Sequence, residues 1–284
     1  MKPKISFTTL ACPEWDVARI VGAAVANGYD AIDFRGYLGD VELPASPAFR
    51  GDALRETAAR VRDAGLAVSC LGSGAKMSAP DAAARAAELD AMRRYADLCA
   101  PLGCRQVRIF GGAAGGLADP VADAAGTLVA AGQIARDAGI EFLVETHDDW
   151  TDTAKLRAAF DAAGRPEGVA LLWDVHHPWA ARGEAPETSA RNLSPFVRNT
   201  HWKDSRPLPD GKRRFCLPGL GDVPLAAIRN ALAAVGYDGW FTLEWEKRWH
   251  PEIEEPGIAI ASFAGFMRGL AADWPAPPLQ ETLP

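Results

Sequence analysis

The chain has 284 residues, 48% of them hydrophobic, and a formal net charge of −7. An acidic surface argues against nucleic acids and anionic membranes as partners, because both attract basic patches. The five cysteines are scattered without zinc-ribbon spacing, and the start of the chain has no long apolar run. These features argue against a secreted or membrane protein, so we expect a reduced, soluble protein of the cytoplasm.

Short runs rich in β-branched and aromatic residues alternate with longer runs rich in alanine and arginine. The runs that predict strands are 4–10, 29–35, 66–72, 106–112, 141–147, 170–177, 197–204 and 239–246. The runs that predict helices are 14–28, 48–65, 80–103, 122–139, 151–164, 223–236 and 257–270, with a weaker one at 185–194. Glycine accepts the left-handed conformation that closes a helix, and four predicted helices end at one: Gly28, Gly65, Gly139 and Gly236.

Strict alternation of strand and helix predicts a parallel sheet covered by helices. Eight such units in this length predict an α/β protein with a single (β/α)₈ barrel over residues 1–272, followed by a Pro-rich tail over 273–284. An open, doubly wound sheet is the alternative, but no glycine-rich phosphate fingerprint follows the first strand. Two loops, 36–48 and 205–222, are longer than such a barrel needs, and we expect them to shape the site.

Four consecutive predicted strands end in groups that can bind a cation. The active site of such a barrel lies at the carboxyl ends of its strands, and alternation along each strand points one set of side chains inward. The inward set is Glu145, Asp174, His201 and Glu244. Three buried carboxylates repel one another unless a positive charge lies among them. The sequence therefore predicts one divalent ion: one nitrogen and several oxygens suit Mn²⁺, Mg²⁺ or Co²⁺, with Zn²⁺ as a further alternative.

The segments EFLVETH, LLWDVHH, NTHWKD and GLGDVPLAAIRNALAAVGYDGWFTLEWE resemble the xylose-isomerase-like TIM barrels, the sugar phosphate isomerase/epimerase superfamily. The resemblance covers nearly the whole chain and is strongest from about 140 to 250. It implies a ketose 3-epimerase-like metal site formed by Glu145, Asp174, His201 and Glu244, with Mn²⁺ as the ion. It also implies that Glu145 and Glu244 carry protons on opposite faces of a keto-sugar, through an enediolate. His177, which matches the family's Asp-x-x-His element, is implied as a substrate contact.

Further inward or nearby groups are candidates for substrate binding. They are Lys203, His147, Glu246 and Arg108. Lys203 has a salt bridge to Glu246 or Asp174 as its alternative role, and His147 has a helix-capping or surface role. Arg35 and Arg108 both have the inward phase, and an ion pair with Asp33 inside the barrel is their alternative role. His176, which alternation also points inward, has no role that the sequence assigns.

The expected function is a metal-dependent isomerase or epimerase acting on a small-molecule carbohydrate, a keto-sugar or a derivative of one. The same site could serve a lyase or decarboxylase acting on a keto-sugar acid or keto-glycoside. A catalytically inactive sugar-binding barrel is the third alternative, although no ligand or base is missing from the set. A homodimer or homotetramer is also expected from the resemblance.

Overall fold

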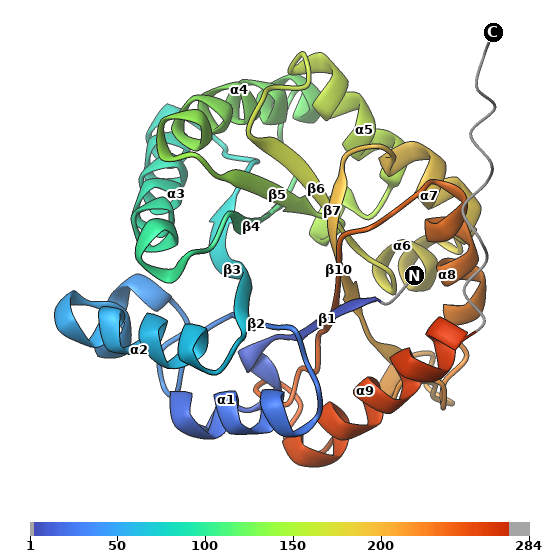
Figure 1. The fold of residues 1–284 in the computed structure, drawn as a ribbon. Helices are drawn as coiled ribbons and strands as arrows, with labels where there is room; N and C mark the ends of the chain where they lie inside the picture. The colour runs from blue at the N-terminus through green and yellow to red at the C-terminus, as the bar shows by residue number, and fades with distance from the viewer. Residues whose placement is uncertain (1–2, 273–284) are drawn as a thin grey trace, which may run out of the picture.

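The fold is a single (β/α)₈ barrel, as predicted, in a computed structural model that describes residues 3–272 (Figure 1). The predicted tail at 273–284 lies outside the described residues. The barrel strands are β1 (Lys4–Phe7), β2 (Ala31–Phe34), β3 (Ala67–Lys76), β4 (Gln106–Phe110), β5 (Glu141–Glu145), β6 (Val169–Asp174), β7 (Val197–Trp202) and β10 (Trp240–Leu243). Each strand forms where the sequence concentrates β-branched and aromatic residues that fit a pleated, buried surface.

The helices form an outer ring around these strands (Figure 1). They are α1 (Val17–Ala26), α2 (Gly51–Asp63), α3 (Ala82–Leu102), α4 (Pro120–Ala138), α5 (Thr153–Ala162), α6 (His177–Arg182), α7 (Pro186–Leu193), α8 (Leu225–Ala234) and α9 (Pro256–Ala272). Four of them begin after an aspartate whose side chain accepts a backbone N–H three residues later, which satisfies a free donor of the first turn. The four predicted glycines all have positive φ, between 68° and 75°. No helix within residues 3–272 is long and apolar enough to cross a membrane.

The strands pair in parallel in the order β1-β10-β7-β6-β5-β4-β3-β2. A single parallel bridge between Thr8 and Asp33 links the two ends of this order and closes the barrel. The pairing of β2 with β3 shifts by one residue between Ile32 and Asp33. The seam of the barrel therefore lies at β1 and β2, and Asp33 lies at both the bridge and the shift.

Side chains alternate between the helical layer and the barrel interior, as the sequence predicts. Large apolar groups such as Trp173, Trp202 and Phe241 belong to the main hydrophobic core. The interior is filled differently, by a small apolar cluster of Leu143, Ala170 and Leu172. Polar pairs fill other parts of the interior, among them Ser6 with Ser69 and Thr242 with Asn199. The side chains that point into the barrel are thus the ones that place polar groups at the carboxyl ends of the strands.

The long loop at 205–222 contains a two-stranded antiparallel hairpin of β8 (Asp204–Pro207) and β9 (Arg213–Cys216). The carboxylate of Asp204 is buried and organises the return of this loop. Its two oxygens accept backbone N–H groups from Ser205, Gly219, Gly221 and Val223. Backbone donors at four positions leave this carboxylate fully hydrogen-bonded, so the loop is built around one side chain.

Gly221→Ala should destabilise the protein by about 1–3 kcal/mol, the cost typical of overpacking. A Cβ at this position would overlap the Asp204 carboxylate and the Ser205 carbonyl. Gly115→Ala is the matched control, because a Cβ there meets no atom within 4 Å. Urea unfolding followed by circular dichroism measures both variants. Equal midpoints for the two would contradict the role given to Asp204.

Candidate metal centre

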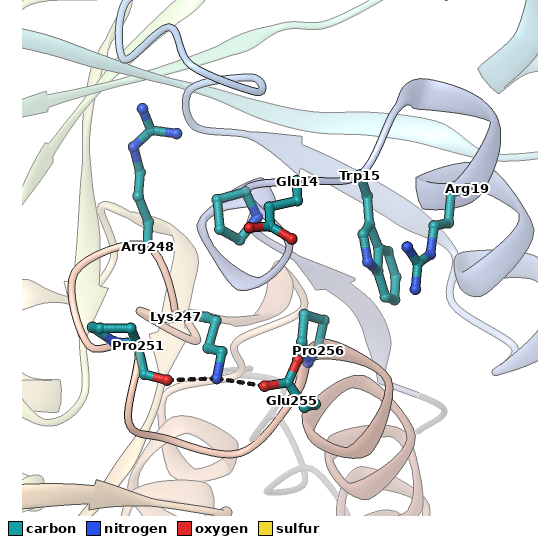
Figure 2. Close-up of a pocket in the computed structure, with 9 residues that line it drawn as sticks. Glu14, Trp15, Arg19, Lys247, Arg248, Pro251, Glu255 and Pro256 are labelled. Atoms are coloured by element: carbon teal, nitrogen blue, oxygen red, sulfur yellow. Dashed lines mark hydrogen bonds and ion pairs between the residues drawn. The ribbon is translucent and has the colours of Figure 1, made fainter.

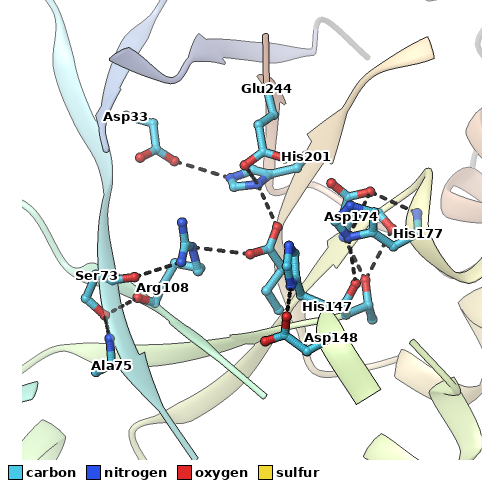
Figure 3. A network of polar contacts seen from close by, with 12 residues as sticks. Asp33, Ser73, Ala75, Arg108, His147, Asp148, Asp174, His177, His201 and Glu244 are labelled. Carbon is cyan, nitrogen blue, oxygen red and sulfur yellow. Dashed lines mark hydrogen bonds and ion pairs between the residues drawn. The ribbon is translucent and has the colours of Figure 1, made fainter. Parts of the chain in front are cut away.

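Four side chains from four neighbouring strands converge at the carboxyl end of the barrel (Figure 3). Glu145 ends β5, Asp174 ends β6, His201 lies near the end of β7 and Glu244 directly follows β10. One ligand atom from each lies within 4.8 Å of the others, and all four residues are buried. Strand alternation predicted this set, and the structure brings all four together.

Each of the two glutamates lies between His201 and a fixed cation. The His201 Nδ1 atom is 3.1 Å from Glu145 Oε1 and 3.2 Å from Glu244 Oε1. Glu145 Oε2 is 3.3 Å from Arg108 Nε, and the Lys203 ammonium is 2.6 Å from Glu244 Oε2. Burial opposes ionisation, but Arg108 holds the pKa of Glu145, and Lys203 that of Glu244, below the ordinary value. Both carboxylates are therefore ionised at neutral pH.

The Asp174 carboxylate is held by the chain that follows it. Its Oδ1 atom accepts the backbone N–H groups of His176 (2.9 Å) and His177 (3.0 Å). This turn ends β6 at Asp174, and helix α6 starts at His177, so the predicted strand to residue 177 is wrong at its last three positions. A side chain that bonds its own downstream backbone competes with strand pairing. Burial raises the pKa of Asp174 to about 6, against the lowering effect of Lys203.

Lys203 forms the ion pairs that were predicted as its alternative role. Its ammonium is 2.6 Å from Glu244, 2.8 Å from Glu246 and 3.0 Å from Asp174. Arg108 is also held inside the barrel, because its guanidinium donates to the Ser73 carbonyl at 2.7 Å and forms an ion pair with Glu145 at 3.3 Å. Neither arginine predicted to pair with Asp33 does so; among the described residues Asp33 pairs with His201.

The donor set fits a divalent cation. Within residues 3–272, Glu145 Oε2 and Asp174 Oδ2 are buried atoms that lack a hydrogen-bond partner. Each of these oxygens has an ion pair, with Arg108 Nε at 3.3 Å or with Lys203 Nζ at 3.0 Å, and a cation among the four groups would be a further partner for both atoms. Three carboxylates and one imidazole form a mixed oxygen and nitrogen set that suits Mn²⁺ and related divalent ions.

His177 and His147 lie at the open side of this cluster. Their rings meet edge to face with centroids 4.7 Å apart. The His177 Nδ1 atom donates to the Thr146 carbonyl at 3.1 Å, which leaves Nε2 as an acceptor. Burial, and then Lys203, lowers the pKa of His177 to about 3, so the ring is neutral. His147 is 35% exposed and hydrogen-bonded to Asp148 at 2.7 Å; burial opposes protonation, but Asp148 raises the pKa of His147.

Sequence reasoning left His176 unassigned and missed its partner on the hairpin. The His176 Nε2 atom lies 2.8 Å from the Ser205 hydroxyl, which also accepts from Arg213 Nε at 2.7 Å. Arg213 in turn is paired with Asp222. His176 thereby joins the turn after Asp174 to the β8–β9 hairpin. No local pattern in the sequence signals a contact between residues so far apart.

The comparisons with known proteins agree with the barrel fold. A model of the xylose isomerase-like TIM barrel matches residues 21–268. The chain belongs to the xylose isomerase-like TIM barrel family. A search of curated protein sequences gives no match.

Solved structures similar to this xylose isomerase-like barrel share its whole architecture at low sequence identity. The IOLI protein with a binding zinc atom has a TM-score of 0.78 at 16% identity, covering 96% of this chain and 99% of that one. An L-ribulose 3-epimerase has a TM-score of 0.77 at 19% identity and 95% coverage of both chains. The probable 3-DHS dehydratase AsbF from Bacillus anthracis has a TM-score of 0.75 at 16% identity, covering 94% and 98%.

Apart from the four-residue cluster, a hollow of about 410 Å³ lies between the loops that follow β1 and β10 (Figure 2). None of the four clustered ligand residues lines it. Its cations are already engaged, because Lys247 contacts the Pro251 carbonyl and Glu255, Arg248 donates to the carbonyls of Leu38 and Gly39, and Arg19 lies over the Trp15 ring. The strand-end cluster is therefore the candidate metal centre.

Acidification should weaken the chelator-treated barrel more than its His176→Asn variant. Burial, and then Lys203, lowers the pKa of His176 to about 2, whereas an unfolded histidine titrates near 6.5. Below pH 6.5 the unfolded chain binds a proton that the folded chain does not, so this group lowers the free energy of unfolding as pH falls. The difference between the two proteins should reach about 1.4 kcal/mol per pH unit between pH 6.5 and 4.5.

Urea unfolding at several pH values measures this difference. Loss of the Ser205 hydrogen bond shifts the variant's stability equally at every pH and so does not alter the slope. Parallel pH profiles for the two proteins would show that His176 titrates normally.

Proposed function

We propose that the protein is a divalent-metal-dependent isomerase or epimerase of a keto-sugar or a sugar derivative. The observation that carries this proposal is the convergence of Glu145, Asp174, His201 and Glu244 within 4.8 Å at the carboxyl ends of neighbouring strands. The family match and the structural similarity to an L-ribulose 3-epimerase support it. Mn²⁺ is the proposed ion on the basis of the donor set, and the zinc in the similar IOLI structure makes Zn²⁺ its competitor.

The four clustered residues would hold the ion, which when bound polarises a substrate carbonyl and acidifies the adjacent C–H. Glu145 and Glu244 are the proposed proton carriers. They approach the centre from β5 and β10, with β6 and β7 between them, so they reach a substrate from two sides. Arg108 and Lys203 keep the two carboxylates ionised, which lets either one accept a proton.

The substrate would enter from the side of His147, His177 and Glu246. These side chains are 35%, 19% and 19% exposed, whereas Glu145 and Asp174 are fully buried. The neutral His177, whose Nδ1 donates to the Thr146 carbonyl, presents Nε2 as an acceptor for a sugar hydroxyl. The predicted contacts of His177 and His147 with substrate remain part of this proposal.

A lyase acting on a keto-sugar acid or keto-glycoside is the second candidate. His147 favours it, because Asp148 raises the pKa of this histidine against the effect of burial, and the protonated ring at the mouth of the site can donate a proton to a leaving oxygen. The structural similarity to a probable dehydratase agrees with this possibility. Both candidates share proton abstraction beside a carbonyl and differ in what leaves afterwards.

Proton NMR in D₂O tests the proposal directly. Metal-loaded protein is incubated with a panel of ketoses, keto-acids and keto-glycosides, with a chelator-treated sample beside it. We expect deuterium beside the carbonyl of one substrate with the metal and none without it. A new stereoisomer or isomer identifies the first candidate, and an unsaturated or cleaved product the second. Sugar binding without exchange would favour an inactive sugar-binding barrel, and absence of both would contradict the proposal.

A further inference from the structure

We infer that Asp33, on β2 and outside the four ligand strands, is a positioning residue that orients His201 and strengthens cation binding. The inference rests on the proposed metal site and adds a residue to it. The Asp33 side chain is 2% exposed and lies 3.5 Å from His201 Nε2 (Figure 3). In the described part of the chain, neither Asp33 oxygen has a hydrogen-bond partner, nor does His201 Nε2.

The two nitrogens of His201 face different groups. Nδ1 points at the glutamate oxygens, 3.1 Å and 3.2 Å away, and Nε2 points at Asp33. An imidazole that binds a cation through one nitrogen carries its proton on the other. Metal-binding histidines commonly donate that proton to a carboxylate, which fixes the ring and raises its basicity. The 3.5 Å separation is longer than a hydrogen bond. The role is therefore assigned from orientation: the Asp33 carboxylate and His201 Nε2 face each other, and within residues 3–272 neither has a hydrogen-bond partner.

The backbone of β2 is shaped to aim this carboxylate. The β2–β3 register shifts between Ile32 and Asp33, and such irregularities re-aim side chains beside functional sites. Asp33 also forms the bridge to Thr8 that closes the barrel. A buried carboxylate held rigidly without a donor is unfavourable unless it acts on a neighbour, and His201 is the neighbour it faces.

Each proposed ligand residue is therefore contacted by a charged side chain or by backbone N–H groups that position it. The pairs are Arg108 with Glu145, the N–H groups of His176 and His177 with Asp174, Lys203 with Glu244, and Asp33 with His201. Arg108, Lys203 and the N–H groups after Asp174 supply positive charge or N–H donors to a carboxylate. Asp33 supplies negative charge, because its ligand is an imidazole.

Calorimetric titration of Zn²⁺ and Mn²⁺ into chelator-treated protein tests the inference. Asp33→Asn keeps the shape of the side chain but removes its charge, and should weaken binding about 10- to 100-fold. Asp63→Asn, an exposed change on α2, is the control and should bind as the wild type does. Thermal unfolding confirms that both variants are folded.

Nitrogen-15 NMR of the Zn²⁺-loaded wild type gives a second readout that needs no variant. We expect the metal on Nδ1 of His201 and the proton on Nε2, with a changed Nε2 shift in Asp33→Asn. A metal on Nε2, or equal affinities and unchanged shifts in the variant, would overturn the inference alone. A wild type that binds neither ion would overturn the proposed function as well.

Discussion

Glu145→Gln should slow deuterium exchange beside the substrate carbonyl by about 10²- to 10⁴-fold, the contribution typical of a positioned general base. Glu145 is fully buried and held ionised beside Arg108, so in the proposed reaction it is a ready proton acceptor. Glutamine has nearly the same shape and keeps an oxygen for Arg108, but it cannot accept a proton. The loss should appear at saturating substrate, while binding of the sugar persists.

Glu141→Gln is the matched control for this variant. Glu141 lies on the same strand at the opposite end of the barrel, where it pairs with Arg198 at 3.4 Å on the half-exposed surface. Its exchange rate should equal that of the wild type. A similar exchange rate for both variants would mean that Glu145 does not take part in the reaction. Sugar binding without exchange in the wild type and in both variants would favour the inactive sugar-binding barrel.

Lys203→Met should have the largest effect on stability, about 3–5 kcal/mol, because removing one member of a buried ionic cluster leaves its partners uncompensated. The Lys203 ammonium is 1% exposed and lies within 3.0 Å of Asp174, Glu244 and Glu246. Methionine fills most of the same volume, so the loss reports charge rather than a cavity. The proposed divalent ion would bind the folded state alone, so Mn²⁺ should restore part of the loss.

Urea unfolding in chelator and again in Mn²⁺ separates these contributions. Lys212→Met is the control, because that lysine is 80% exposed and pairs with Asp210 at the surface. Its unfolding midpoint should change little in either condition. A Lys203→Met protein as stable as the control would mean that the three carboxylates do not depend on this ammonium.

Most of the fold and the ligand set could be predicted from the sequence because both follow from local periodicity. Alternation along a strand decides which way Glu145, His201 and Glu244 point, and parallel order decides that they meet. The prediction failed after Asp174, where a side chain bonds its own backbone and ends the strand. Local pattern does not reveal which of two competing hydrogen bonds forms.

The partners of the ligands could not be predicted, because they depend on contacts between distant elements. The inward phase of Asp33 was visible, but Arg35 and Arg108 share that phase and made an ion pair the simpler interpretation. Its partner is instead on β7, across the barrel from β2. One missed element did have a signal: Asp210-Gly211 between two short strand-like runs is a typical hairpin turn.

The seam between β1 and β2 is the place where this barrel is least cooperative. Elsewhere neighbouring strands are joined by ladders of several paired residues, whereas within residues 3–272 β1 and β2 share the single bridge of Thr8 with Asp33 and a hydrogen bond from the Asp30 N–H to the Ile5 carbonyl. Local opening has its lowest free energy where few backbone hydrogen bonds must break. Amide hydrogens at this seam should therefore exchange with solvent sooner than those of β5 and β6. Local opening of the seam near Asp33 would couple slow local unfolding of the barrel to cation binding at the proposed site.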